Sequence, residues 1–252
     1  MTIQTYTIRF SQGSQAPAIG ISPDGDAGLA IRSLKLKHPR PVIFITGGAA
    51  KMNKSDIQAT RHLIAKGIAP FAQKHQITVI SGGTEAGIMQ MMGDARMDGH
   101  YTFPLIGVSP LGCVKFPGKP GSGDEEAELN DGHSHFVLVK GDEWGMESRM
   151  IVELTRKISH SGKKPMLGIL INGGQVAMND VYLATAKGKH SIPMLVIAGS
   201  GRTADEVAKA YTTQIAPNPI LKAIIAGGNI KVVELKDGLE AFGQKLKEAF
   251  QS

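Results

Sequence analysis

At residues 78–89 the chain reads Thr78-Val79-Ile80-Ser81-Gly82-Gly83-Thr84-Glu85-Ala86-Gly87-Ile88-Met89. An apolar run that ends in two glycines, followed by apolar residues at helical spacing, predicts a buried strand, a tight turn and a helix. Glycine lets the backbone turn sharply and lets a ligand approach it closely. The free N–H groups at the helix start would attract a phosphate or a carboxylate. The spacing is not that of the motif G-x-G-x-x-G, so a turn that needs glycine only for its shape is the alternative.

The chain repeats this arrangement several times. Apolar runs alternate with helical segments, and continuous apolar runs are typical of parallel strands that are covered on both faces. We therefore predict an α/β fold with a doubly wound, mainly parallel sheet and helices on both faces. In such sheets ligands bind at the carboxyl ends of the strands. Four glycine-rich turns follow predicted strands and favour one shared ligand cleft: Gly47-Gly48, Gly82-Gly83-Thr84, Asn172-Gly173-Gly174 and Gly199-Ser200-Gly201-Arg202.

Length and composition limit the class of protein. The 252 residues, 42% of them apolar and 20% charged, suit a globular protein, and we predict a single domain over residues 1–252. Cys113 is the only cysteine, which excludes an internal disulfide and a cysteine-based zinc site. The net charge is +6, but no basic stripe interleaved with aromatic residues indicates nucleic-acid binding. No apolar run approaches the roughly 18 residues that span a membrane. We expect a cytoplasmic protein with no nucleic-acid or membrane partner.

Residues 111–134 interrupt the alternation of strands and helices. Prolines and glycines lead there into the acidic run Asp124-Glu125-Glu126, and a loop of about twenty residues is often functional. We expect residues 114–134 to close over the ligand; a solvated excursion is the alternative, preferred for the acidic run. His133 and His135 would point the same way on a strand, as metal ligands do. No third ligand has suitable spacing, so we expect structural histidines and no metal site.

Polar residues near two predicted helix starts have alternative roles. Glu143 and Glu147 are four residues apart, next to a helix predicted from about Met146, and could share a helix face; they would bind a ribose hydroxyl, act as an acid–base pair or be solvated. Trp144 would stack on an adenine or cover the edge of the core. Arg202 would hold a diphosphate with its guanidinium, or lie at the surface. The residues after it, Thr203 to Glu206, predict a capping box.

Taken in order, five segments resemble one family. They are Ser81-Gly82-Gly83-Thr84-Glu85-Ala86-Gly87-Ile88-Met89, Asn130-Asp131-Gly132-His133-Ser134-His135-Phe136, Gly141-Asp142-Glu143-Trp144-Gly145, Asn172-Gly173-Gly174, and Gly199-Ser200-Gly201-Arg202-Thr203-Ala204-Asp205. The ordered set resembles the SLOG superfamily over roughly residues 40 to 210. It is most similar to the prokaryotic branch related to the N-terminal homology region of melastatin-type TRP channels.

The resemblance implies a Rossmann-like fold that binds nucleotide-derived ligands of the ADP-ribose and NAD class, with no required cofactor. It implies phosphate contact at Gly83 and Thr84, an aromatic contact at Trp144 and an arginine contact at Arg202. A second arginine of the channels falls on Ile151, with Arg149 nearby. The predicted ligand-binding residues are Gly47, Gly48, Gly82, Gly83, Thr84, Glu85, Gly87, Trp144, Glu147, Asn172, Gly173, Gly174, Gly199, Ser200, Gly201 and Arg202.

More distant relatives in the same superfamily, the LOG phosphoribohydrolases, suggest an enzymatic alternative. Met146-Glu147-Ser148-Arg149 looks like their arginine segment, and residues 172–180 occupy the place of their Pro-Gly-Gly-x-Gly-Thr-x-x-Glu motif. Proline, the third glycine and threonine are missing, and Asp180 replaces the glutamate. Glu147, Arg149 and Asp180 are therefore the catalytic candidates for hydrolysis of a nucleotide N-glycosidic bond. A third hypothesis is a ligand-gated self-association module, and we expect a homo-oligomer.

Overall fold

The strands form one large sheet and a small one. The structure is a computed structural model that describes residues 4–119, 126–186 and 191–250. The strands of the large sheet are β1 (Gln4–Arg9), β2 (Gln15–Ile21), β3 (Val42–Gly47), β4 (Thr78–Ser81), β5 (Leu105–Pro110), β8 (His135–Val139), β9 (Met166–Ile171), β10 (Met194–Ala198) and β11 (Ile230–Glu234). The small sheet pairs β6 (Val114–Lys115) with β7 (Ala127–Glu128).

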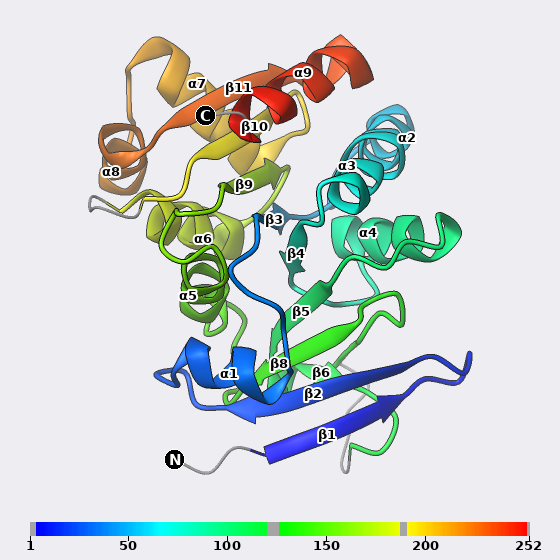
Figure 1. The fold of residues 1–252 in the computed structure, drawn as a ribbon. Coiled ribbons are helices and arrows are strands. Elements are labelled where there is room, and N and C mark those ends of the chain that lie inside the picture. The colour runs from blue at the N-terminus through cyan, green and yellow to red at the C-terminus, as the bar shows by residue number, and fades with distance from the viewer. Residues whose placement is uncertain (1–3, 120–125, 187–190, 251–252) are drawn as a thin grey trace.

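The order of the large sheet is β1-β2-β8-β5-β4-β3-β9-β10-β11 (Figure 1). Only β1 runs antiparallel to its neighbour, and every other pair is parallel. From β3 the chain proceeds outward through β4, β5 and β8, and it then returns to the other side of β3 with β9, β10 and β11. The strand order therefore reverses between β3 and β9, which is the position where doubly wound sheets bind ligands.

Helices cover both faces of this sheet. They are α1 (Ala27–Ser33), α2 (Lys54–Leu63), α3 (Ala69–Lys74), α4 (Gly87–Asp98), α5 (Ser148–Ile158), α6 (Gln175–Thr185), α7 (Arg202–Thr213), α8 (Pro219–Gly227) and α9 (Gly238–Phe250). In Figure 1, α1, α5, α6 and α8 lie to the left of the sheet and α2, α3 and α4 to its right. The predicted α/β architecture, Rossmann-like and mainly parallel, is confirmed.

Two core clusters reflect the alternation of side chains along each strand. Phe44 of β3 packs in the cluster beneath α1 and α5 to α8, whereas its neighbours Ile43 and Ile45 pack in the cluster beneath α2 to α4 and α9. Every residue of β9 and of β10 is buried. This explains why these strands read as continuous apolar runs rather than as alternating ones.

Local signals predict some helix boundaries and miss others. Asn53 caps α2 as expected, because its side-chain oxygen accepts a hydrogen bond of 2.9 Å from the Asp56 N–H. The helix predicted from there to His75 contains a π-helical turn, Ile64–Ile68, between α2 and α3. Helix α8 was not predicted, although the Asn218 cap and Pro219 at the first helical position are a recognisable start signal.

The segment after β5 is tied to the turn that follows β4. Thr84 forms an antiparallel bridge with Leu129, the Asn130 N–H donates to the Gly83 carbonyl at 2.9 Å, and the Glu85 N–H donates to the Glu128 carbonyl at 2.7 Å. Of the acidic run, Asp124 and Glu125 lie outside the described residues. The described part of the segment therefore packs on the turn as a support.

Candidate functional site

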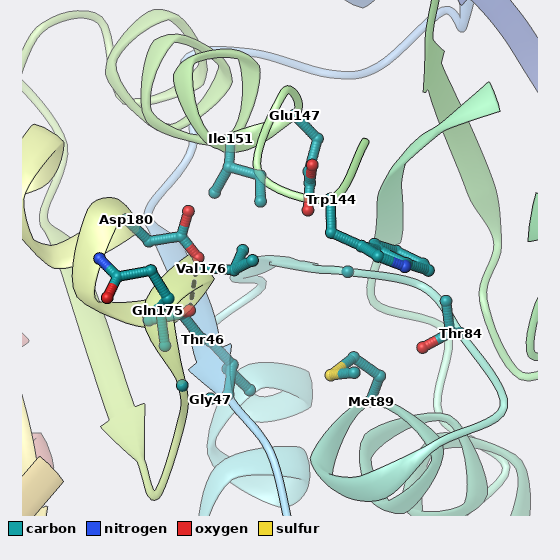
Figure 2. A pocket seen from close by; sticks show the side chains of 14 residues that line it. Thr46, Gly47, Thr84, Met89, Trp144, Glu147, Ile151, Gln175, Val176 and Asp180 are labelled. Atoms are coloured by element: carbon teal, nitrogen blue, oxygen red, sulfur yellow. Dashed lines mark hydrogen bonds between the residues drawn. The ribbon is translucent and has the colours of Figure 1, made fainter. Parts of the chain in front are cut away.

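A cavity of about 290 Å³ lies at the reversal of strand order, at the carboxyl ends of β3, β4 and β9 (Figure 2). Its lining comes from β3, the turn after β4, the start of α4, the segment from Trp144 to α5, and the start of α6. The lining residues are Ile45, Thr46, Gly47, Gly82, Thr84, Met89, Trp144, Glu147, Ile151, Gly174, Gln175, Val176, Ala177 and Asp180. Turns that are far apart in the sequence thus meet at one cavity.

Gly47 is required where β3 meets β9. Its φ is +138°, and a Cβ at this position would lie 1.8 Å from the carbonyl oxygen of Ile171. The next residue continues the contact, because the Gly48 N–H donates to the same carbonyl at 3.1 Å. Only glycine allows the two strands to approach this closely at the cavity floor.

A buried polar network holds the turn after β4. The Ser81 hydroxyl is 2.8 Å from Nε2 of His133, and Nδ1 of His133 is 2.9 Å from the side-chain oxygen of Asn130. The Gly83 N–H donates to the Ser81 hydroxyl at 3.3 Å. Burial lowers the pKa of His133 to about 3, so the ring is neutral. Ser81, His133 and Asn130 are at most 2% exposed and do not line the cavity, so this arrangement supports the turn and is not accessible to a substrate.

The two histidines are not paired on a strand. His135 begins β8, whereas His133 precedes the strand and belongs to the buried network. Burial, with the positive charge of Arg96, lowers the pKa of His135 to about 4. Within residues 4–119, 126–186 and 191–250, no three histidine, cysteine or acidic side chains form a group that could hold a metal.

The N-terminus of α6 opens onto the cavity. Within the described residues, no hydrogen bond uses the N–H groups of Gln175, Val176 and Ala177, and the first N–H of α6 that is paired belongs to Met178. Asn172 holds the preceding turn: its φ is +54°, its amide donates to the Ser200 carbonyl at 2.7 Å, and its oxygen accepts from the Gly173 N–H at 2.7 Å. Three free N–H groups and the positive end of the helix dipole therefore face the lining.

The fourth glycine turn supports the third turn. The Thr203 and Ala204 N–H groups donate to the carbonyls of Gly173 and Asn172, at 3.5 and 3.0 Å. The predicted capping box is wrong, because α7 begins at Arg202 with Gly201 as its cap and no side chain caps it. The Thr203 hydroxyl instead donates to the Gly174 carbonyl at 3.1 Å. The Thr203 and Ala204 N–H groups thus donate hydrogen bonds within the protein and are not free for a ligand.

Arg202 reaches the rim of the cavity. Its Nη2 atom would lie 2.6 Å from a Cβ at Gly174, so the guanidinium packs directly over this lining glycine. The side chain is exposed, and no ion pair or hydrogen bond within the described residues involves it. Its φ of +52° is uncommon for a residue with a Cβ. A strained, unpaired cation beside free helix N–H groups is suited to an anion.

Two buried carboxyls form one side of the cavity. Asp180 is 3% exposed and accepts a 2.5 Å hydrogen bond from the Thr46 hydroxyl, and Glu147 is 4% exposed and accepts one of 2.7 Å from the Gly145 N–H. Burial raises the pKa of Glu147 to about 7, and the charge of Asp180 adds to the rise. Burial also raises the pKa of Asp180 to about 6, although the Ser148 and Thr46 hydroxyls partly oppose this. We call Glu147, Ile151 and Asp180 the carboxyl wall; Figure 2 shows them opposite Thr84 and Met89.

The pKa of Glu147 predicts a pH-dependent gain in stability for Glu147→Gln. The folded pKa of about 7 lies above the ordinary 4.5, so the contribution of this group to stability is full below about pH 4.5 and is lost as the pH rises through 7. Glutamine keeps an acceptor for the Gly145 N–H and carries no charge. At pH 8 the variant should be more stable than the parent by an amount on the order of 3 kcal/mol.

Urea unfolding of both proteins at pH 4.5 and 8 measures this difference. Glu143→Gln is the matched control, because Glu143 is exposed and precedes α5. Equal stability of parent and Glu147→Gln at both pH values would contradict a buried, proton-binding Glu147.

Comparisons with known proteins identify the family. Residues 40–242 match the family described as "SLOG in TRPM, prokaryote". The chain belongs to this family. It is 28% identical to transient receptor potential cation channel subfamily M member-like 2 of Nematostella vectensis. The matched region covers 87% of this chain and 16% of the channel. It is 25% identical to subfamily M member 2 of Rattus norvegicus, over 89% of this chain and 16% of the channel.

A third relative is more distant, and the channels are much longer than this chain. Subfamily M member 1 of Mus musculus is 23% identical over 75% of this chain and 13% of the channel. The SLOG chain thus spans about a sixth or less of the relatives it matches. Each helix in the described part of the chain is too short or too polar to span a bilayer.

The structure places the predicted site residues of the SLOG chain in two groups. Gly47, Gly82, Thr84, Trp144, Glu147 and Gly174 line the cavity, and Asp180 joins them. The remaining predicted residues lie outside the lining: Gly48, Gly83, Glu85, Gly87, Asn172, Gly173, Gly199, Ser200, Gly201 and Arg202. Glu85 is held by Gln90 and Asn130, at 2.7 and 2.6 Å. Sequence reasoning missed Thr46 and Gln175, and it gave no role to the apolar lining.

The structure corrects two predictions about the residues at the start of α5. The helix begins at Ser148, so Glu143 and Glu147 both precede it and do not share one of its faces. Arg149 is on the helix but does not line the cavity; its Nη1 atom pairs with Asp24 at 2.7 Å, with both side chains more than half exposed. Ile151 does line the cavity. None of the described residues 114–119 and 126–134 contributes to the lining.

Proposed function

We propose that the cavity binds a nucleotide-derived, phosphate-containing ligand of the ADP-ribose and NAD class. The observation that supports this most is the convergence of Gly47, Gly82 and Gly174 on one cavity, with free α6 N–H groups and Arg202 beside it. Backbone N–H groups at a helix start and an arginine fork are the usual means of holding phosphate oxygens.

The size and lining of the cavity suit one end of such a ligand. A volume of about 290 Å³ is at the lower end of the roughly 300–1,000 Å³ of ligand pockets. The rest of a dinucleotide-sized ligand would extend along the rim, where Trp144 is 49% exposed and offers a stacking surface. No cofactor or metal is needed for binding alone.

Calorimetric titration with ADP-ribose, NAD and AMP tests this proposal. We expect saturable binding of at least one of them with one ligand per chain. Absence of heat and of thermal stabilisation with all three would contradict it. The same titration followed by light scattering tests whether the ligand changes the association of the chain with itself.

A second function, hydrolysis of a nucleotide N-glycosidic bond, is favoured by the carboxyl wall. The cavity contains two carboxyls whose pKa values are raised to about 7 and 6. General acid–base catalysis at neutral pH requires groups with pKa values in this range. Arg149 does not support it as a phosphate ligand, because it pairs with Asp24 away from the cavity. Release of free base from AMP, lost in Glu147→Gln and Asp180→Asn, would establish this activity; intact AMP after prolonged incubation would exclude it for this substrate.

A further inference from the structure

We infer that the carboxyl wall is a subsite for the ribose hydroxyls of the ligand and that it rejects a phosphate at that position. The inference rests on the proposed function and makes Asp180 a specificity-determining residue. It divides the cavity into two ends. The start of α6 beside Arg202 would hold the phosphate, and the carboxyl wall would hold the uncharged hydroxyls of the ribose.

The unpaired oxygen of Asp180 carries this inference. Oδ2 accepts a hydrogen bond from the Thr46 hydroxyl, whereas the buried Oδ1 has no hydrogen-bond partner among the described residues. The side chain lines the cavity. A buried acceptor left without a donor costs about 1–3 kcal/mol. A ligand hydroxyl that donates to Oδ1 would recover this free energy. The Ser148 hydroxyl, at the start of α5, lies close enough to lower the pKa of Asp180, but among the described residues it forms no hydrogen bond of ordinary length and angle with Oδ1.

The charges around this wall disfavour an anion. Asp180 on α6 and Glu147, which precedes α5, both line the cavity, and the charge of Asp180 raises the pKa of Glu147. Among the described residues, no lysine, arginine or histidine lines the cavity. Ile151 of α5 presents an apolar side chain to the cavity. A phosphate here would meet two carboxyls with no cation to compensate them.

The spacing along α6 fits one nucleotide. Asp180 is five residues after Gln175, a rise of about 7.5 Å along the helix. A phosphate held by the first N–H groups of α6 therefore leaves the sugar of a nucleoside 5′-phosphate beside the carboxyl wall. Carboxylates commonly accept hydrogen bonds from ribose hydroxyls, and they exclude a phosphate on the same sugar.

A series of AMP analogues tests the subsite by calorimetry on the full chain. Relative to AMP, 2′-deoxy-AMP or 3′-deoxy-AMP should bind about tenfold more weakly, as expected for one lost hydrogen bond to a charged group. Adenosine 2′,5′-bisphosphate and 3′,5′-bisphosphate should bind more weakly still. In Asp180→Asn, AMP should bind more weakly, and the difference between AMP and the bisphosphates should shrink. Near pH 6, AMP binding should release more protons from the parent than from Asp180→Asn, measured in two buffers of different ionisation enthalpy; the phosphate, whose second pKa is about 6, contributes to both.

The outcomes separate this inference from the proposed function. No binding by AMP or ADP-ribose would overturn both. Equal affinity of the parent for AMP, both deoxy analogues and both bisphosphates would overturn the subsite alone, as would binding of ADP-ribose without AMP. An unchanged AMP-to-bisphosphate ratio in a folded Asp180→Asn would remove Asp180 as the selecting residue. If that variant does not fold, the analogue series on the parent decides.

Discussion

Gly47→Ala is expected to destabilise the fold strongly, whereas Gly48→Ala, one residue later, should leave stability nearly unchanged. A Cβ at Gly47 would lie 1.8 Å from the Ile171 carbonyl oxygen, and the φ of +138° is itself unfavourable for alanine. The added Cβ would be fixed to the backbone of β3 and would meet the backbone of β9. Neither strand can move away without breaking the hydrogen bonds that pair them. A Cβ at Gly48 would meet nothing within 4 Å.

The expected loss for Gly47→Ala is at least about 4 kcal/mol, in the range of the most damaging single substitutions. Circular dichroism during urea unfolding measures it, with Gly48→Ala as the control. A Gly47→Ala protein that unfolds at the same urea concentration as the parent would show that β3 and β9 do not approach as closely as the structure has them.

Arg202→Ala should weaken the binding of ADP-ribose by about 10- to 100-fold, which is the effect of losing hydrogen bonds between an arginine and a phosphate. Arg202 packs over Gly174 and has no partner of its own among the described residues. Its removal should therefore cost binding without costing stability. Arg149→Ala is the matched control, since Arg149 forms an exposed pair with Asp24 and should change neither by more than about 1 kcal/mol.

Trp144, the only tryptophan, allows this binding to be followed by fluorescence. It is 49% exposed and lines the cavity, so an occupied cavity should change its emission. Equal weakening by both arginine substitutions, or none by Arg202→Ala, would argue against a phosphate held at this rim.

The fold could be predicted from the sequence because its signals are local and repeated. Strands such as β9 and β10 are buried on both faces, so their apolar runs are unbroken and easy to recognise. Glycines at the strand ends mark places where the backbone must turn or approach another strand. The start of α7 was predicted wrongly because the Thr203 hydroxyl bonds to Gly174, a contact 29 residues away that no local pattern contains.

The site could be predicted only in part. Glycine turns and unusual polar residues led to Gly47, Gly82, Thr84, Glu147 and Gly174, all of which line the cavity. The same reasoning could not separate glycines that face the cavity from those that permit packing, such as Gly83, where a Cβ would be 2.7 Å from Gly107 Cα. Ile45, Met89, Ile151 and Val176 resemble core residues in sequence, since an apolar side chain gives no sign of whether it faces a cavity.

A crystal structure of the protein grown with saturating ADP-ribose would locate the phosphate and the ribose of the bound ligand. We predict that phosphate density will lie within hydrogen-bond distance of the first N–H groups of α6 and of the Arg202 guanidinium. We also predict that a ribose will lie against Asp180. Ligand density at another place on the molecule, or an empty cavity at the carboxyl ends of β3 and β9 in such crystals, would contradict both assignments.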